Sequence, residues 1–311
     1  MATVAPNSVP AVPQGFRLGT YPVVGGEQER PVHKVRFPKF DSLEAEREHR
    51  KLHQAAALRW LGYNGYNNEG AGGHVTVRDP IMPDHFWVRI PSLVQQFGGE
   101  INPHSKSFSH MRPEDLCLVD EKGVVKEGGN MHVINPAGYV IHSAIHKARP
   151  DVVAAVHCHS IPSKAFSSLG IKLDPINQDA CRFYNDHSIC FHHGGIAFKK
   201  DEGTAIAEAL AGNKVVILGN HGHLSVGKTV DQATFFFGAF DRCIQAQMLA
   251  DTAAAARGIK PIKVSHEAAE YSRTNYTDEM AYIMFQSAFE DVVRASNGEL
   301  SFHVRGELPR E

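Results

Sequence analysis

The 311-residue sequence predicts an α/β fold, because segments with the pattern of buried strands alternate with segments of helical spacing. Two short apolar runs, Val152–Val156 and Val215–Leu218, have the β-branched content of buried strands. A predicted helix precedes each of them, at residues 136–148 and 201–211. We find no internal repeat and no linker in the middle of the sequence, so one α/β domain is the simplest interpretation.

The first third of the sequence predicts an arm, a helix and two strands. Residues 1–38 contain six prolines and few periodic apolar positions, which favours an extended or disordered arm. The domain is then expected to span residues 39–296, with a loose tail at 297–311. Its first helix begins at a capping box around Ser42 and ends at Gly62. A glycine-rich turn at 70–73 leads into a strand at 74–78, and 86–90 is the expected partner strand.

The remaining elements follow in order. Residues 91–112 are expected to be irregular, and a strand at 116–120 comes next. Asn135-Pro136 supplies the N-cap and first residue of the helix that ends at Ala148. We expect a short helix at 161–169, a turn-rich stretch at 175–195 and a final helical region at about 265–295. Thr229 is expected to cap the longest helix.

Composition excludes several classes of partner. The formal charge is −2 and the isoelectric point is near 6.8, so there is no electrostatic case for binding nucleic acid or an anionic membrane. Five cysteines without framework spacing suit a reducing compartment. No apolar run approaches the roughly 18 residues that span a bilayer. We therefore expect a cytoplasmic protein that acts on a small molecule.

Histidines follow both of the predicted buried strands. His157 and His159 flank Cys158, and because strand side chains alternate between faces, these two histidines point the same way. The second strand leads into Gly219-Asn220-His221-Gly222-His223. Three neutral imidazoles bind Zn²⁺ tetrahedrally with one position open, so we predict His157, His159 and His221 as metal ligands. His223 is then expected to orient a ligand or contact substrate.

These motifs resemble those of the class II aldolase/adducin N-terminal domain family. The resemblance covers about residues 41 to 260, and it rests on the segments Arg149-Pro150-Asp151, Val156-His157-Cys158-His159-Ser160, Gly219-Asn220-His221-Gly222 and Val226 to Ala233. It implies a three-layer α/β/α fold with a mostly antiparallel central sheet. It also implies a divalent metal, Zn²⁺ with Fe²⁺ as the alternative, held by the three histidines. A homotetramer with active sites at subunit interfaces is implied as well.

The sequence departs from the sugar-phosphate aldolases of that family at two places. Those enzymes carry an acidic acid/base residue at the position that matches Gly138, whereas this sequence has no Asp or Glu between Gly128 and Asp151. Their phosphate-binding residues are replaced by Gly73-His74-Val75-Thr76 and Pro136-Ala137. The sequence therefore resembles the adducin-like and secondary-metabolism branches more closely, and a non-phosphorylated substrate is expected.

The function expected from these features is that of a metal-dependent lyase. It would cleave a carbon–carbon bond, by retro-aldol reaction or decarboxylation, or perform a related elimination. Tyr139 and His142 are the candidates for proton transfer, because they share a helix face where the acidic residue is missing. His74 and His223 are the candidates for substrate contact. A non-haem iron oxygenase, a non-catalytic adducin-like interaction protein, and an isomerase or dehydratase remain as alternatives.

Overall fold

The computed structural model describes residues 36–67, 72–89, 107–128, 136–191 and 200–300. The chain divides into two units, Met1–Arg36 and Phe37–Glu311, and the fold discussed below is that of the second unit. Most of the expected arm, most of the expected irregular stretch at 91–112 and residues 301–311 of the expected tail lie outside the described residues.

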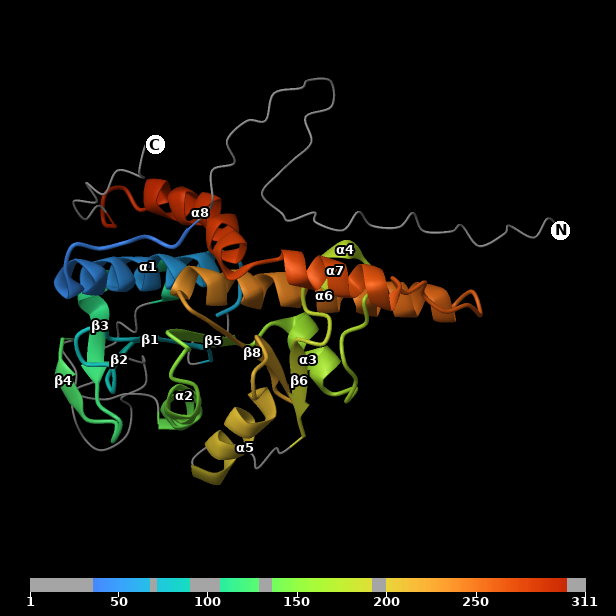
Figure 1. Cartoon of the computed structure of the whole chain (residues 1–311), viewed down its shortest axis with the longest axis horizontal. Helices are drawn as coiled ribbons and strands as arrows, with labels where there is room; N and C mark the ends of the chain where they lie inside the picture. The colour runs from blue at the N-terminus through green and yellow to red at the C-terminus, as the bar shows by residue number, and fades with distance from the viewer. Residues whose placement is uncertain (1–35, 68–71, 90–106, 129–135, 192–199, 301–311) are drawn as a thin grey trace, which may run out of the picture. The chain divides into compact units, whose positions relative to one another are not determined.

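The centre of the fold is an eight-stranded sheet with the strand order β4-β3-β2-β1-β5-β8-β7-β6 (Figure 1). All neighbouring strands are antiparallel except β6 and β7, which are parallel, so the mostly antiparallel sheet is confirmed. The strands are β1 His74–Arg78, β2 Phe86–Arg89, β3 Leu116–Val119, β4 Val125–Glu127, β5 Ala154–Cys158, β6 His187–Cys190, β7 Val215–Leu218 and β8 Gly222–Gly227.

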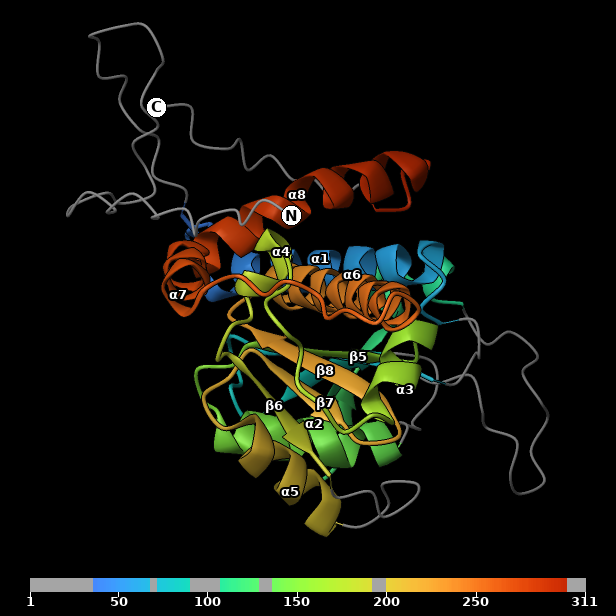
Figure 2. The ribbon, with the colours of Figure 1, turned by 90° about the vertical axis from the view of Figure 1, so that its right-hand side faces the viewer.

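Helices cover both faces of the sheet, as Figure 2 shows. The side of the sheet that α2 and α5 cover is opposite to the side covered by α1 and α6, and α8 packs on α1 and α6. This is the three-layer α/β/α arrangement that the family resemblance implies. The helices are α1 Leu43–Tyr63, α2 Pro136–Ala148, α3 Ile161–Ser167, α4 Gln178–Cys181, α5 Lys200–Leu210, α6 Val230–Ala255, α7 His266–Asn275 and α8 Asp278–Ala295. Among them, none is long and apolar enough to cross a membrane.

Hydroxyl side chains begin the two helices that pack along the sheet. The Ser42 hydroxyl accepts a hydrogen bond from the Ala45 backbone N–H at 3.1 Å, and this bond caps α1. The Thr229 hydroxyl caps α6 in the same way, through the Gln232 N–H at 3.1 Å. Both caps are confirmed at the residues that the sequence indicates.

The sheet contains three strands that the sequence analysis does not predict, namely β4, β6 and β8. β6 lies in the stretch expected to be turn-rich, at the edge of the sheet, and only its first and last residues are buried. β8 begins and ends on glycine, which suggests loops, yet all six of its residues are buried between β5 and β7. The expected helical region at 265–295 is two helices, because Ser265 caps α7 and Thr277 caps α8.

Strand β5 holds the centre of the sheet and is buried on both faces. Ala154, Val156 and Cys158 belong to the cluster under α1 and α6. Ala155 belongs to the cluster under α2 and α5, so the alternation of a strand puts His157 on that second side. The fold therefore fixes which layer the first histidine of the pair enters.

Candidate metal centre

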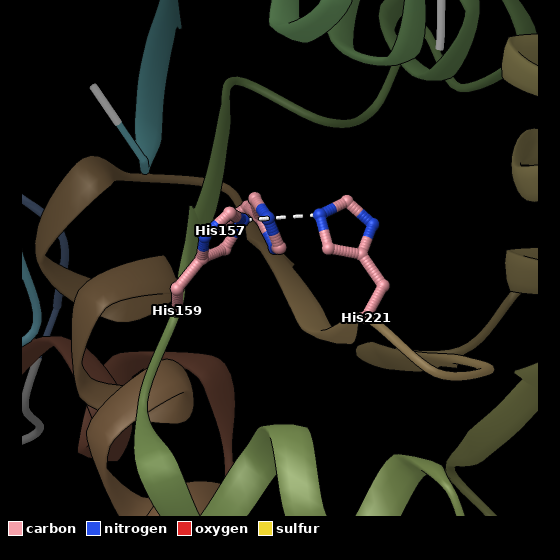
Figure 3. Close-up of side chains that lie close together, drawn as sticks. All are labelled: His157, His159 and His221. Carbon is pink, nitrogen blue, oxygen red and sulfur yellow. Dashed lines mark hydrogen bonds between the residues drawn. The ribbon is translucent and has the colours of Figure 1, made fainter. Parts of the chain in front are cut away.

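Three histidines meet where β5 and β7 end. His157 lies near the end of β5 and His159 directly follows that strand, whereas His221 lies in the tight turn between β7 and β8. Asn220 adopts a positive φ of 56°, a left-handed conformation that lets the chain reverse there. Figure 3 shows the three imidazole rings turned towards one another from these two segments.

The spacing of these rings suits one small metal ion. One ring nitrogen from each histidine can be chosen so that all three lie within 4.8 Å of one another. His159 Nε2 and His221 Nε2 are 3.0 Å apart, and the three pairs of ring centroids are separated by 4.7 to 5.0 Å. Nitrogen ligands of tetrahedral zinc stand about 3.3 Å from one another, given Zn–N bonds of about 2.0–2.1 Å. The arrangement needs only small side-chain adjustments to meet that geometry.

One hydrogen bond fixes the tautomer of His157. Its Nδ1–H donates a hydrogen bond to the backbone carbonyl of His223 at 2.8 Å, which leaves Nε2 as the bare nitrogen. Nε2 is buried and has no hydrogen-bond partner within the described part of the chain. Burial, and next the neighbouring His221 and His159, hold the pKa of His157 well below its usual value, so the ring is neutral. A buried lone pair without a donor fits a metal ligand, since the metal would satisfy it.

Gly72, just before β1, makes room for the His159 ring. A Cβ atom at Gly72 would lie 2.7 Å from His159 Nδ1, closer than real Cβ atoms approach other atoms. Gly72 therefore allows the backbone to lie directly against the His159 ring. The sequence alone makes a plain tight connection the better interpretation of the glycine-rich turn at 70–73. The structure adds that its glycine is needed for close approach to the histidine cluster.

The side chain of His223 lies outside this cluster. Its Nε2–H donates to the Phe237 carbonyl at 3.2 Å, its Nδ1 accepts from the Ser163 hydroxyl at 2.7 Å, and its ring stacks on Phe237. These contacts place the His223 side chain on the α6 side of the sheet. In the pairing of β5 with β8, His223 is opposite Cys158, so the two side chains share the face that His157 does not enter. The contacts do not favour substrate contact by the His223 side chain. Its backbone carbonyl instead orients His157.

Tyr139 is also held away from the three histidines. Its ring packs in a cluster with Phe86 and Val119, and its hydroxyl donates to the backbone carbonyl of Asp120. Burial raises the pKa of Tyr139 to about 12. Although Tyr139 and His142 are three residues apart on α2, the first faces the β3–β4 turn and the second faces β1. These contacts favour a packing role for Tyr139.

His74 and His142 lie beside the cluster. The His74 ring is parallel to that of His157, with centroids 6.5 Å apart, and its Cα pairs with that of His157 between β1 and β5. The His142 ring meets the His74 ring edge-on at 5.8 Å. Burial, and next the neighbouring His146, lower the pKa of His142 to about 3, so this ring is neutral as well. The structure thus brings together five of the seven residues that the sequence nominates.

Two further residues belong to this group although the sequence analysis assigns them no role. The Thr76 hydroxyl lies 2.8 Å from His142 Nδ1 and 2.8 Å from His146 Nε2, and it links the two rings. Thr76 is two residues after His74 on β1, and His146 is four residues after His142 on α2. Both spacings keep side chains on one face, and this is the signal that could have found them.

Residues 53–248 match the family model of the class II aldolase and adducin N-terminal domain. The meiotically up-regulated gene 14 protein of Schizosaccharomyces pombe is 39% identical and aligns over 85% of this chain and 96% of its own length. The 4-hydroxy-3-prenylphenylpyruvate oxygenase/4-hydroxy-3-prenylbenzoate synthase of Streptomyces roseochromogenus is 38% identical over 72% of this chain and 75% of its own. The decarboxylase NovR of Streptomyces niveus is 38% identical over 70% and 75%.

A solved structure is similar over most of the fold. The L-fuculose 1-phosphate aldolase from Glaciozyma antarctica superposes with a TM-score of 0.74 and is 34% identical. The match covers 86% of this chain and 98% of that aldolase. The similarity therefore extends over both helical layers and the sheet between them.

Proposed function

Since the chain belongs to the class II aldolase and adducin N-terminal domain family, we propose that it is a metal-dependent lyase. It would cleave a carbon–carbon bond, by retro-aldol reaction or decarboxylation, or perform a related elimination on a non-phosphorylated small molecule. The observation that carries this proposal is the cluster of His157, His159 and His221, with a bare and buried Nε2 on His157. The similarity to a decarboxylase supports the reaction class.

In this proposal His157, His159 and His221 hold a divalent metal ion, and Zn²⁺ is the first choice. Three neutral imidazoles are the donor set of catalytic zinc sites, in which the fourth position stays open. A metal bound there would stabilise negative charge on a substrate oxygen. The protein keeps His157 in the required tautomer through the His223 carbonyl and excludes water from its buried side.

Proton transfer is assigned to the side of the site where His74 and His142 lie. His74 flanks His157 directly and is proposed to contact substrate, and His142 lies next to it. Both are neutral at physiological pH, because burial lowers their pKa values, and a neutral imidazole can accept a proton. Tyr139 is the weaker candidate for this step, since its hydroxyl already donates to the Asp120 carbonyl.

Gly73-His74-Val75-Thr76 and Pro136-Ala137, which replace the phosphate-binding residues of the sugar-phosphate aldolases, support a non-phosphorylated substrate, and turnover of a substrate panel can test this. The similar aldolase of known structure is named for a sugar phosphate. A panel of β-keto acids and β-hydroxy ketones should therefore be turned over, whereas L-fuculose 1-phosphate should not. Cleavage of the sugar phosphate at a comparable kcat/KM would contradict this part of the proposal.

We also propose a homotetramer of cytoplasmic subunits in which residues 39–296 are the folded domain. Large apolar side chains next to both histidine segments support a subunit contact there, because Ile161 is 78% exposed and Phe191 is 69% exposed. Ile161 comes two residues after His159, and the Cys190 carbonyl beside Phe191 accepts from the Gly219 N–H in the turn that carries His221. All five cysteines are buried free thiols, which supports a reducing compartment.

Metal analysis of untagged protein is the direct test. We expect about one metal ion per subunit in the wild type, and a sharp loss in His159→Ala with the circular dichroism spectrum unchanged. His266→Ala, which removes an exposed histidine at the start of α7, is the matched control and should keep full metal content. Full stoichiometric metal in His159→Ala would overturn the site assignment, and metal-free wild type would favour the non-catalytic interaction protein.

A non-haem iron oxygenase is the second candidate, and the similarity to a prenylphenylpyruvate oxygenase favours it. Three imidazoles with open positions also suit Fe²⁺. The two candidates are separated by loading the purified protein with Zn²⁺ or with Fe²⁺ under anaerobic conditions and measuring oxygen uptake with 4-hydroxyphenylpyruvate-type substrates. Oxygen uptake that requires Fe²⁺ would establish the second candidate. Product formation with Zn²⁺ and without oxygen would establish the first.

A further inference from the structure

Helix α6 supports the first histidine of the cluster from the opposite side of the sheet. The carbonyl of Phe237, on α6, accepts a hydrogen bond from His223 Nε2–H at 3.2 Å. The His223 carbonyl in turn accepts from His157 Nδ1–H at 2.8 Å. Two successive hydrogen bonds therefore connect the His157 ring to α6.

One helical turn further along α6, the Asp241 carboxylate contacts the residue that follows the second histidine. The Ser160 hydroxyl donates a hydrogen bond to Asp241, and its oxygen accepts one from the Ser163 N–H at 3.1 Å, which caps α3. Asp241 is 4% exposed and Ser160 is 5% exposed. Because Ser160 is the next residue after His159, the position of the Ser160 hydroxyl limits where the His159 backbone can lie.

A second hydroxyl reaches the same carboxylate from the end of α1. The Tyr66 hydroxyl donates a hydrogen bond to Asp241, and the Tyr66 ring packs edge-on against Phe237 with the centroids 5.2 Å apart. The Tyr66 N–H donates to the Leu61 carbonyl at 3.0 Å, so the tyrosine is also attached to the last turn of α1. Asp241 therefore joins the end of α1 to the connection between β5 and α3.

The buried carboxylate holds both hydroxyls in place. Burial raises the pKa of Asp241, and the hydrogen bonds from Ser160 and Tyr66 oppose that rise. A buried carboxylate without donors is costly, so a movement of either hydroxyl away from Asp241 is unfavourable. The three side chains therefore form one unit that restrains two separate segments of the chain.

Both of these segments lead to the His159 ring. Ser160 follows His159 directly, and Gly72 comes six residues after Tyr66. A Cβ atom at Gly72 would lie 2.7 Å from His159 Nδ1, and one at Gly73 would lie 3.0 Å from Cys158 Sγ. The backbone before β1 thus packs against the end of β5 without spare room. A shift of either segment would therefore displace the His159 ring.

We propose that Asp241 is a positioning residue for His159. By accepting hydrogen bonds from both Ser160 and Tyr66, the carboxylate fixes the place of the His159 ring relative to His221, whose Nε2 is 3.0 Å from His159 Nε2. Helix α6 then supports both histidines at the end of β5. This inference rests on the proposed function, because His159 is a metal ligand in it. Asp241 acts only through the segments that it restrains.

Tyr66→Phe and Ser160→Ala each remove one of the two hydrogen bonds to Asp241, and zinc affinity measures the effect. We expect each variant to bind Zn²⁺ about tenfold more weakly than the wild type, the lower end of the loss that follows when a residue supporting a metal ligand is removed. The double variant should bind no more weakly than the weaker single variant, because either change already releases one segment from the shared carboxylate. Competition with a chromophoric chelator gives the affinity, and the absorption bands of bound Co²⁺ report the ligand geometry.

Three matched variants separate positioning from general destabilisation. Ser160→Thr keeps a hydroxyl that can both donate to Asp241 and cap α3, so it should restore the wild-type affinity and cobalt spectrum. Ser42→Ala removes the cap of α1, and Tyr282→Phe removes a buried tyrosine hydroxyl on α8. Both should bind zinc as the wild type does. A tenfold loss in either of them would mean that lower stability alone weakens the site, and would refute the inference.

Hydrogen exchange in the metal-free protein measures the restraint without zinc. The loss of one hydrogen bond to a charged group changes a local opening equilibrium about tenfold or more. Peptides that contain His159 should therefore exchange about tenfold faster in Tyr66→Phe and in Ser160→Ala, while peptides from β2 and β3 should exchange at the wild-type rate. Unchanged exchange around His159 in both variants would contradict the restraint.

The same samples separate this inference from the proposed function. If His159→Ala loses zinc while Tyr66→Phe and Ser160→Ala keep the wild-type affinity and cobalt spectrum, the inference fails alone. Losses that multiply in the double variant would also defeat it, because they would show two independent supports in place of one shared carboxylate. Full zinc affinity in His159→Ala, or none in the wild type, would defeat the proposed metal site and the role of Asp241 with it.

Discussion

The contact between Gly138 and His74 predicts an unusual response to a conservative substitution. Gly138 lies inside α2, where alanine is ordinarily better than glycine by about 0.5–1 kcal/mol. Here the new methyl group would lie 2.2 Å from two atoms of the His74 ring. Overpacking of this kind costs about 1–3 kcal/mol, because the ring must leave its rotamer. We therefore expect Gly138→Ala to lower the free energy of unfolding by about 0.5–2 kcal/mol.

A double-mutant cycle isolates the ring from the helix. With His74→Ala in the background the obstacle is gone, so Gly138→Ala should raise the free energy of unfolding by about 0.5–1 kcal/mol, as helix propensity alone requires. The sign of the substitution thus reverses, and the coupling energy should be about 1–3 kcal/mol. Urea denaturation of metal-free protein, followed by circular dichroism, measures all four variants.

Gly212 provides the control for this cycle. It follows α5, and a Cβ atom there would meet nothing within 4 Å. Gly212→Ala should therefore be neutral or stabilising by about 0.4–1 kcal/mol through the unfolded chain, in both backgrounds. If Gly138→Ala behaves like Gly212→Ala in the wild-type background, then the His74 ring does not occupy the space beside α2, and the reasoning about His74 fails.

Two other predictions concern the rest of the domain. The buried Asp79 carboxylate accepts hydrogen bonds from Arg47 Nε at 2.7 Å and from Trp87 Nε1 at 2.7 Å. Burial raises the pKa of Asp79, but these hydrogen bonds lower it further, so that the pKa lies below its usual value. The contribution of ionised Asp79 to the free energy of unfolding is therefore present above the unfolded-state pKa and is lost as pH falls through the folded-state pKa. Asp79→Asn should cost about 1.5–3 kcal/mol at pH 7 and progressively less as the pH falls below 4. A cost that does not change with pH in urea titrations would contradict this prediction. Phe191→Glu should shift the protein from tetramer to smaller species in light scattering, whereas an unchanged mass would exclude this surface from the interface.

The three-histidine cluster could be predicted from the sequence because local rules determine it. Strand alternation alone places His157 and His159 on one face, and the glycines around His221 mark a turn at the end of a second strand. His223 could not be assigned in this way. His223 lies on β8, a strand that begins and ends on glycine and is not recognised from the sequence. Without that strand, the face of the sheet on which the His223 side chain lies cannot be assigned.

The contacts of Tyr139, His142 and Thr76 show a second limit of sequence reasoning. Helical spacing groups Tyr139 with His142, but α2 crosses the sheet, so neighbouring positions on one side of the helix contact different strands. Thr76 joins two residues that are 66 and 70 positions away in the chain. Contacts between residues so far apart in the chain depend on which strand pairs with β1. The hydrophobic periodicity of the sequence does not predict strand order.

The central place of β8 also determines when the three-histidine cluster can form during folding. His159 and His221 are 62 positions apart in the chain, and they meet only after β8 has paired with β5 on one side and β7 on the other. Closing that loop is costly in entropy, so this pairing belongs to the slow, long-range part of the folding reaction. Of the three histidines in the cluster, only His157 and His159 are close together in an unfolded chain. A metal ion held by all three histidines would therefore bind a finished sheet and stabilise it by mass action, in contrast to small zinc domains, whose chains fold around the metal.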